Sequence, residues 1–286
     1  MAMTAPVSIV GAGRTGRTLG RLIHRAGIAV GAVTCRSIER AREAAAFIGA
    51  GTPAAGAPTG RLSGVVLICV PDGAVAEVAS GLEVAPGTVV AHVAGALGSE
   101  AAAGARGGEP GSLHPLRSFA DPERAAAAFA GTACAVEGSP RAAEVLKELV
   151  HRIGGTPLHV APGGKPLYHA GAVFASNYVV ALFHAAERLF EAAGIPRESG
   201  RRALGGLAEG TLENVKAAGP EGALTGPVER GDDRTVRRHL EAIRAAVPDL
   251  AAAYSEMGRT TLDLARSRGS LARDAAERVA AALEVP

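Results

Sequence analysis

The sequence predicts an α/β domain with a doubly wound parallel sheet, followed by an all-helical domain. In the first half of the chain, short β-branched runs alternate with amphipathic segments, a pattern typical of parallel strands connected by helices. After residues 161–164, a Pro- and Gly-containing break, apolar residues recur only at helical spacing. We therefore predict a doubly wound domain over residues 1–160 and a helical domain over residues 161–286.

The elements of the first domain follow in order along the chain. Strands are predicted where β-branched or continuous apolar runs end in glycine or a polar residue. Helices are predicted where apolar residues become periodic, with an N-cap residue and a proline opening two of them. The predicted strands are 7–10, 28–34, 65–70, 88–93, 132–136 and 156–160, and the predicted helices are 15–26, 38–48, 72–80, 122–129 and 140–153.

The second domain is predicted to contain five helices. They cover about 166–193, 197–218, 233–246, 249–267 and 270–283, with Gly and Pro residues at the breaks. The first is long and apolar on more than one side, which is typical of a helix buried by its neighbours. Because the helical half carries more apolar surface than one chain obviously covers, we expect a homodimer through this domain.

Composition excludes several classes of protein. The 286 residues include 30 basic and 28 acidic side chains, so no nucleic-acid partner is expected. Cys35, Cys69 and Cys134 are not spaced as CxxC, which argues against a metal site or a structural disulfide. No membrane span or signal peptide is recognisable, and lysine is rare compared with arginine. We expect a cytoplasmic protein from a GC-rich bacterium.

A glycine-rich turn follows the first predicted strand and opens the first helix. Gly11 allows a tight turn, Gly13 lets a ligand approach the backbone, and Gly16 allows close packing of helix on strand. Arg14 and Thr15 complete the turn at the positive end of the helix dipole, where a pyrophosphate can be bound. The sequence therefore predicts a Rossmann-like dinucleotide site.

The end of the second predicted strand indicates which dinucleotide is bound. NAD enzymes typically place Asp or Glu there, whereas this chain has Arg36 and Ser37, with Arg40 one turn later. A guanidinium and a hydroxyl suit a 2′-phosphate, so NADP is the expected cofactor, and Arg14 adds to the same charge preference. The alternative is that Ser37 caps the next helix and Arg36 is solvated.

Polar residues at the ends of later strands are candidates for the reaction site. Val70, Pro71 and Asp72 end one predicted strand, and His92 ends the next, at the edge where parallel sheets bind ligands. His114 follows a glycine-rich stretch that should pass the same edge. His92 or His114 could donate a proton, although both could equally bond neighbouring backbone.

The long predicted helix adds two polar residues. His169 and Asn177 are eight residues apart, so on one continuous helix they share a face and could both point into a cleft between the domains. Their partners there would be substrate or cofactor, or another helix.

Four segments together resemble a known group of proteins: GAGRTG, SLHPLRSF, YHAGAVFASNYVVAL and LTGPVERGD. The chain resembles the Rossmann-like proteins that carry a C-terminal helical domain of unknown function, relatives of pyrroline-5-carboxylate reductase, ketopantoate reductase and the 3-hydroxyacid dehydrogenases. The resemblance implies an NADP-dependent oxidoreductase whose second domain is like that of 6-phosphogluconate dehydrogenase and often forms the dimer.

One departure from these relatives affects the expected mechanism. The 3-hydroxyacid dehydrogenases have a catalytic lysine four residues before an asparagine; if Asn177 matches that asparagine, the lysine position holds Val173. Pyrroline-5-carboxylate reductase also lacks the lysine and reduces a C=N bond. We therefore expect reduction of a small C=O or C=N substrate between the domains, with His114 or His169 as proton donor and Asn177 as a hydrogen-bonding partner. A non-catalytic NADP-binding regulatory protein is the alternative.

Overall fold

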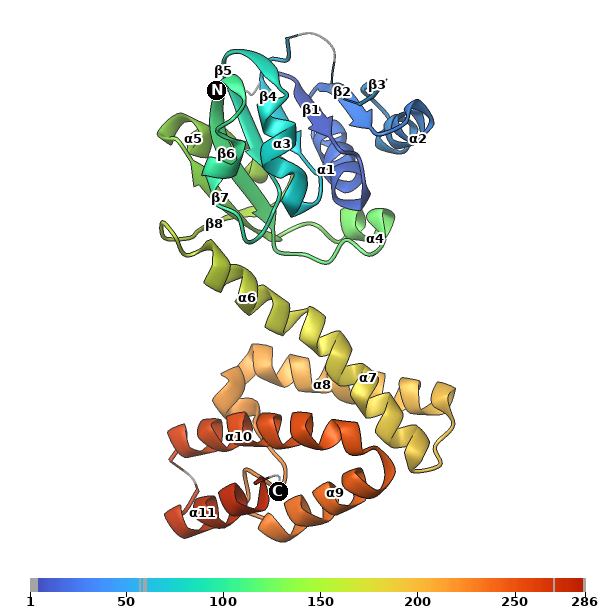
Figure 1. The fold of residues 1–286 in the computed structure, drawn as a ribbon, viewed down its shortest axis with the longest axis vertical. Helices are drawn as coiled ribbons and strands as arrows, with labels where there is room; N and C mark the ends of the chain where they lie inside the picture. The colour runs from blue at the N-terminus through green and yellow to red at the C-terminus, as the bar shows by residue number, and fades with distance from the viewer. Residues whose placement is uncertain (1–4, 57, 59–60, 270, 285–286) are drawn as a thin grey trace. The chain divides into compact units, whose positions relative to one another are not determined.

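The computed structural model describes residues 5–56, 58, 61–269 and 271–284 and divides into two compact units, Met1–Ser176 and Asn177–Pro286 (Figure 1). The first unit holds the sheet with its helices and ends with α6 (Lys165–Ala175). The division falls one helix later than the predicted boundary at residue 160, because side chains at the start of α6 contact the ends of two strands.

The first unit is built on one eight-stranded sheet in the order β3-β2-β1-β4-β5-β6-β7-β8. All neighbouring strands are parallel except β6 and β7, which are antiparallel. The chain winds outward in both directions from the β1–β4 pair, so the carboxyl ends of these two strands form a crevice of the kind that binds ligands. The strands are β1 (Val7–Val10), β2 (Val30–Cys35), β3 (Thr52–Ala55), β4 (Val65–Ile68), β5 (Glu83–His92), β6 (Arg106–Pro115), β7 (Ala133–Gly138) and β8 (Thr156–His159).

Alternating side chains of the central strands pack on both faces of this sheet. On β4, Val65 and Leu67 belong to the core with α1, α2 and α5, whereas Val66 and Ile68 belong to the core with α3. The predicted doubly wound α/β domain is thereby confirmed. The helices and 3-10 turns of this unit are α1 (Arg14–Arg25), α2 (Ile38–Ile48), η1 (Asp72–Ala74), α3 (Val75–Ser80), η2 (Ser99–Ala102), α4 (Pro122–Ala127) and α5 (Pro140–Arg152).

Two strands were not predicted, and one of them changes the sheet. Strand β3 carries proline and alanine, and β6 carries four glycine and proline residues before Ser112, so neither has strong β-propensity. Strand β6 forms because it is paired on both sides and closely packed. A Cβ on its Gly111 would lie 2.8 Å from Leu146 Cδ1 of α5. Its antiparallel partner β7 is the departure from the all-parallel expectation.

The second unit is helical. Its core contains Val236, Leu240, Leu262, Val279 and Leu283. None of the helices in the described ranges is long and apolar enough to cross a membrane. The elements are α7 (Asn177–Ala192), α8 (Arg197–Ala223), α9 (Asp233–Ala246), η3 (Pro248–Leu250), α10 (Ala251–Ser267) and α11 (Arg273–Ala282). Ser270, the predicted start of the last helix, lies outside the described residues.

The long helix predicted over 166–193 is two helices. The backbone leaves the helical region at Ser176 (φ −128°, ψ −74°), which ends α6 before α7 begins. The spacing argument that placed His169 and Asn177 on one face assumed an unbroken helix, so it does not hold across this break. Within a single chain Glu187 is the buried residue of α7, so the expected burial of this helix is not provided by the described residues of the chain itself.

Candidate functional site

The turn between β1 and α1 is packed tightly against the sheet and open on its outer side. Gly11 has φ +90°, and a Cβ there would lie 2.9 Å from the Cys69 carbonyl oxygen. A Cβ on Gly16 would lie 2.7 Å from the Gly11 carbonyl oxygen, whereas one on Gly13 would meet nothing within 4 Å. No side chain caps the N-terminus of α1 and its first turn has no acidic residue, so its free N–H groups can donate hydrogen bonds to an anion.

A cavity of 1040 Å³ adjoins this turn and contains several arginines. Arg17 pairs with Glu43 at 3.4 Å. Arg14, Arg36 and Arg40 also line the cavity and form no ion pair within the described part of the chain. Its lining carboxylates are Glu43 and Glu77, so the four arginines give the cavity a net positive charge, and the end of β2 holds Arg36 where NAD enzymes typically have a carboxylate.

Ser37 is the N-cap residue of α2, which is the alternative role that the sequence allows. Its Oγ accepts a hydrogen bond of 3.4 Å from the Arg40 backbone N–H and so caps α2. Its hydroxyl also hydrogen-bonds the Glu39 carboxylate, and its contact with a ligand stays a prediction.

A second cavity, of 600 Å³, shares Gly13 and Arg14 with the first and extends toward β5. Thr15 and the predicted triplet Val70, Pro71 and Asp72 all line it, together with Val93, Ala94 and the segment Ser118–Ala120. The two cavities form a continuous surface from the glycine turn to the end of β5.

Two of the three candidate histidines of the first unit, His114 and His169, lie together next to Gly95. A Cβ on Gly95 would collide with His169 Nδ1 and would lie 2.9 Å from His114 Nε2, so both rings press on this glycine. His114 Nδ1 and the Tyr168 hydroxyl share a hydrogen bond of 2.9 Å. His169 Nδ1 is buried and has no hydrogen-bond partner among the described residues. Two ring nitrogens therefore converge on one point without protein partners.

The protonation states of His114 and Tyr168 follow from their burial. Burial, with the nearby Lys165 ammonium and the other imidazoles adding to it, lowers the pKa of His114 to about 4. Burial raises the pKa of Tyr168 to about 12, so the phenol keeps its proton and can donate it to Nδ1. In that arrangement His114 is neutral and carries its ring proton on Nε2, the nitrogen next to Gly95.

His92 is a structural residue in this arrangement. It is fully buried; its Nε2 donates to the Gly98 carbonyl oxygen at 2.8 Å, and its Nδ1 accepts from the Ala94 N–H at 3.2 Å. Both ring nitrogens are thus engaged by backbone, and burial lowers the pKa of the ring. Proton donation by His92, considered from sequence, would require breaking one of these bonds.

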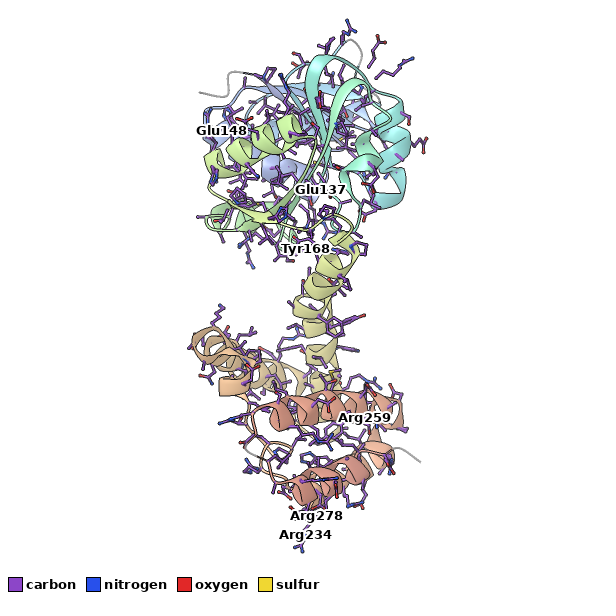
Figure 2. The ribbon with its side chains drawn as sticks, turned by 90° about the vertical axis from the view of Figure 1, so that its left-hand side faces the viewer. Glu137, Glu148, Tyr168, Arg234, Arg259 and Arg278 are labelled. Atoms are coloured by element: carbon purple, nitrogen blue, oxygen red, sulfur yellow. The ribbon has the colours of Figure 1, made fainter. Side chains whose placement is uncertain are left out.

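Sequence reasoning missed Lys165, Tyr168, Ser112 and Glu137. Lys165 is 3% exposed, and its Nζ donates to the Ala94 carbonyl oxygen at 3.5 Å. Ser112 is opposite Glu137 across β6 and β7, and their Oγ and Oε2 atoms are buried without partners among the described residues. Figure 2 labels Glu137 and Tyr168 in the first unit. The available signals were the rarity of lysine in this chain and the position of Ser112 two residues before His114 on one strand face.

Asn177 is not part of this group in the first unit. It is the first residue of α7, in the second unit, and its side chain is exposed. Its role as a hydrogen-bonding partner of a substrate stays a prediction. In the described part of the chain, no three His, Cys, Asp or Glu side chains are placed to hold a metal ion.

The chain matches two family models. The model described as a Rossmann-like domain matches residues 3–115, and the model described as Domain of unknown function (DUF2520) matches residues 132–261. The chain is a Rossmann-like protein with a DUF2520 domain. The expected domain combination is thereby confirmed. None of the curated proteins compared with the chain matches it.

Three solved structures are similar to this chain over nearly its whole length. Protein TM1727 from Thermotoga maritima is 28% identical, with a TM-score of 0.75 over 92% of this chain and 99% of its own. A putative NADP oxidoreductase, BF3122 from Bacteroides fragilis, is 23% identical, with a TM-score of 0.71 over 94% and 99%. The 1-pyrroline-5-carboxylate reductase of Streptococcus pyogenes is 15% identical, with a TM-score of 0.65 over 93% and 100%. The last two similarities establish the shared fold.

The low pKa of His114 predicts a pH dependence of stability. The unfolded chain binds a proton at this ring as the pH falls below the ordinary value of 6.5, whereas the folded chain does so only near 4. We therefore expect the free energy of unfolding to decrease between these two values and His114→Gln to reduce that decrease. Urea titrations across this pH range measure the effect. His151→Gln, at an exposed residue of α5, is the matched control, and an unchanged pH slope in His114→Gln would contradict the prediction.

Proposed function

We propose that this Rossmann-like protein with a DUF2520 domain is an NADP-dependent oxidoreductase that reduces a small C=O or C=N compound. The observation that carries the proposal is the continuity of the two cavities. An anion-binding turn and unpaired arginines lie at one end, and Val93 and Ala94, beside the buried Lys165 and His114, lie at the other. A dinucleotide has its phosphates and its reactive ring at opposite ends, which suits this separation.

The residues present fit the cofactor in charge and shape. The open face above Gly13 and the free N–H groups of α1 would hold the pyrophosphate. Arg36 and Arg40 would hold the 2′-phosphate, and Arg14 would add positive charge between the two sites. Reduced NADP, when bound, supplies a hydride for the substrate carbon. The protein then needs to orient the substrate and supply a proton.

The similarities support the same reading. One solved relative is described as a putative NADP oxidoreductase and another as a reductase of 1-pyrroline-5-carboxylate, a cyclic imine. A regulatory protein that only binds NADP is the alternative. The buried polar group around Gly95 favours the enzyme, because unpaired buried nitrogens and an unpaired buried ammonium are costly to folding and are typical of reaction sites.

Turnover distinguishes the two functions. The purified protein is mixed with NADPH and a panel of small cyclic imines, ketones and keto acids, and loss of NADPH absorbance is followed. We expect oxidation of NADPH with at least one member of the panel. Tight NADPH binding without turnover across the whole panel would contradict the reductase and support the regulatory protein.

Arg36 is expected to set the preference for NADPH over NADH. Replacing it in Arg36→Asp removes a charged hydrogen-bond donor and adds a carboxylate that repels the 2′-phosphate. Because a charged contact of this kind contributes about 1.5–3 kcal/mol, we expect NADPH affinity to fall about tenfold or more. Binding of both nucleotides is measured by calorimetry.

Arg42→Asp is the control for this experiment. It makes the same charge change on α2, at an exposed residue that does not line the cavity. A preference for NADPH that survives Arg36→Asp, or that Arg42→Asp abolishes equally, would show that Arg36 does not bind the 2′-phosphate.

We also propose that two copies associate through α7 and α8. Val180 and Leu182 on α7 and Leu207 on α8 are 70%, 50% and 67% exposed. Exposed apolar side chains of this size on two packed helices are typical of surfaces covered by another protein. A second copy of the chain satisfies this surface symmetrically.

Light scattering tests the dimer. We expect a mass of twice 28.6 kDa for the natural chain at micromolar concentration. The double substitution Val180→Glu and Leu207→Glu places charge on the proposed interface, so it should give the single-chain mass. Met257→Glu, on a half-exposed residue of α10, should leave the dimer intact. A natural chain of 28.6 kDa would refute the proposal.

A further inference from the structure

Lys165 is a buried cation without a counter-ion. Its side chain is 3% exposed, and within the described residues no carboxylate lies close enough to form an ion pair with it. Its one hydrogen bond is the 3.5 Å contact with the Ala94 carbonyl oxygen, and its Nζ lies 5.7 Å from the centre of the Tyr168 ring. An ammonium has three protons to donate, so this arrangement leaves hydrogen-bonding capacity unused in a buried position.

Lys165 adjoins the 600 Å³ cavity that we assign to the reactive end of the dinucleotide. Ala94, whose carbonyl holds Nζ, lines the 600 Å³ cavity together with Val70 and Pro71. His114 and His169, which both press on the next residue, Gly95, flank the same place. Nζ therefore contacts a residue that lines this cavity on its β5 side.

The neighbouring groups make Lys165 the natural acid of this site. The Tyr168 phenol and the Ser112 hydroxyl are neutral, and His114 is uncharged at neutral pH because burial holds its pKa to about 4. Burial lowers the pKa of Lys165, while the carboxylates of Glu137, Asp72 and Glu100 act in the opposite direction and favour the charged form. The facing imidazole of His92 is neutralised in the same way as that of His114.

We propose that Lys165 is the proton donor of the reduction, with its Nζ hydrogen-bonded to the carbonyl oxygen or imine nitrogen of the substrate. This inference rests on the proposed function and replaces His114 and His169 as the donor. The substrate carbon receives a hydride with its electron pair, and the π pair of the C=O or C=N bond moves onto oxygen or nitrogen. That atom takes a proton from Nζ, which becomes a neutral amine and regains a proton from water.

The substrate's own charge provides the sharpest test. A ketone or neutral imine needs a proton as it accepts hydride, whereas an N-methyl iminium ion becomes a neutral amine without one. In Lys165→Met, which keeps the length of the side chain, kcat for the neutral substrates should fall about 10²- to 10⁴-fold. The kcat for the N-methyl iminium substrate should stay within a few-fold of that of the natural protein.

Three comparisons accompany this variant. Lys165→Arg keeps the charge but holds its proton, so it should not restore kcat for a ketone. His114→Gln should retain more activity than Lys165→Met, and Lys147→Met, at an exposed lysine of α5, should behave as the natural protein. Since a donor must be protonated, kcat should fall as the pH rises through the pKa of Lys165, and Lys165→Arg should lack that limb.

A spectroscopic measurement tests the assignment without turnover. The chain has only three lysines, Lys147, Lys165 and Lys216, so ¹³C-lysine labelling gives three Cε signals that the three single variants assign. We expect the Lys165 signal to titrate at lower pH than the two exposed lysines. Titration of all three together would overturn the proposal.

The kinetic outcomes distinguish a failure of the proposed function from a failure of the donor assignment. A natural protein that binds NADPH but turns over no substrate refutes the proposed function, and the donor assignment with it. A natural protein with turnover and a Lys165→Met variant with unchanged kcat on ketones refutes the donor assignment alone. An equal loss for ketone and iminium substrates would show that Lys165 only maintains the structure of the site.

Discussion

The burial of the Lys165 ammonium is the constraint on which the rest of the site depends. A buried cation without an ion pair opposes folding unless its surroundings are shaped to tolerate it. Here the Ala94 carbonyl holds the ammonium and the Tyr168 ring lies beside it, while three carboxylates act from a greater distance. The same positive charge helps to keep His92 and His114 neutral. Burial is the main reason that these two histidines are neutral, and the Lys165 charge adds to it.

The topology of the sheet brings the two halves of the site within reach of each other. The β1–β4 switch places the glycine turn next to Val70 and Pro71, and β5 extends the same edge to Ala94. Strand β6 then carries Ser112 and His114 on the face that also holds His92, because paired residues of neighbouring strands share a face. The first turn of α6, at the C-terminal end of the first unit's sequence, adds Lys165 and Tyr168 to this group.

The sequence predicted the fold class and the phosphate-binding half of the site because both depend on local patterns. The glycines of the first turn are required by contacts within one strand–turn–helix segment, so their spacing is informative. Strand β6 was missed because its glycines and prolines read as a loop, and pairing with two neighbours overrides that preference. Lys165 was missed because nothing local distinguishes a buried lysine from an exposed one. The break at Ser176 also has no Gly or Pro to mark it, so the helix that carries His169 was drawn too long.

In the group around Gly95, our proposal gives substrate orientation and proton donation to different residues. The neutral imidazole of His114 can orient a substrate through hydrogen bonds, but it holds no proton that it readily gives up at neutral pH. Gly95 has no side chain, and this absence makes room for the two rings, because a Cβ there would collide with His169 Nδ1 and would lie 2.9 Å from His114 Nε2. In our proposal the Lys165 ammonium, held by the Ala94 carbonyl, supplies the proton that the His114 imidazole does not carry. Burial acts on all of these groups in the same direction. It lowers the pKa of His92 and His114, which are therefore neutral, and it lowers the pKa of Lys165, which therefore releases its proton more easily.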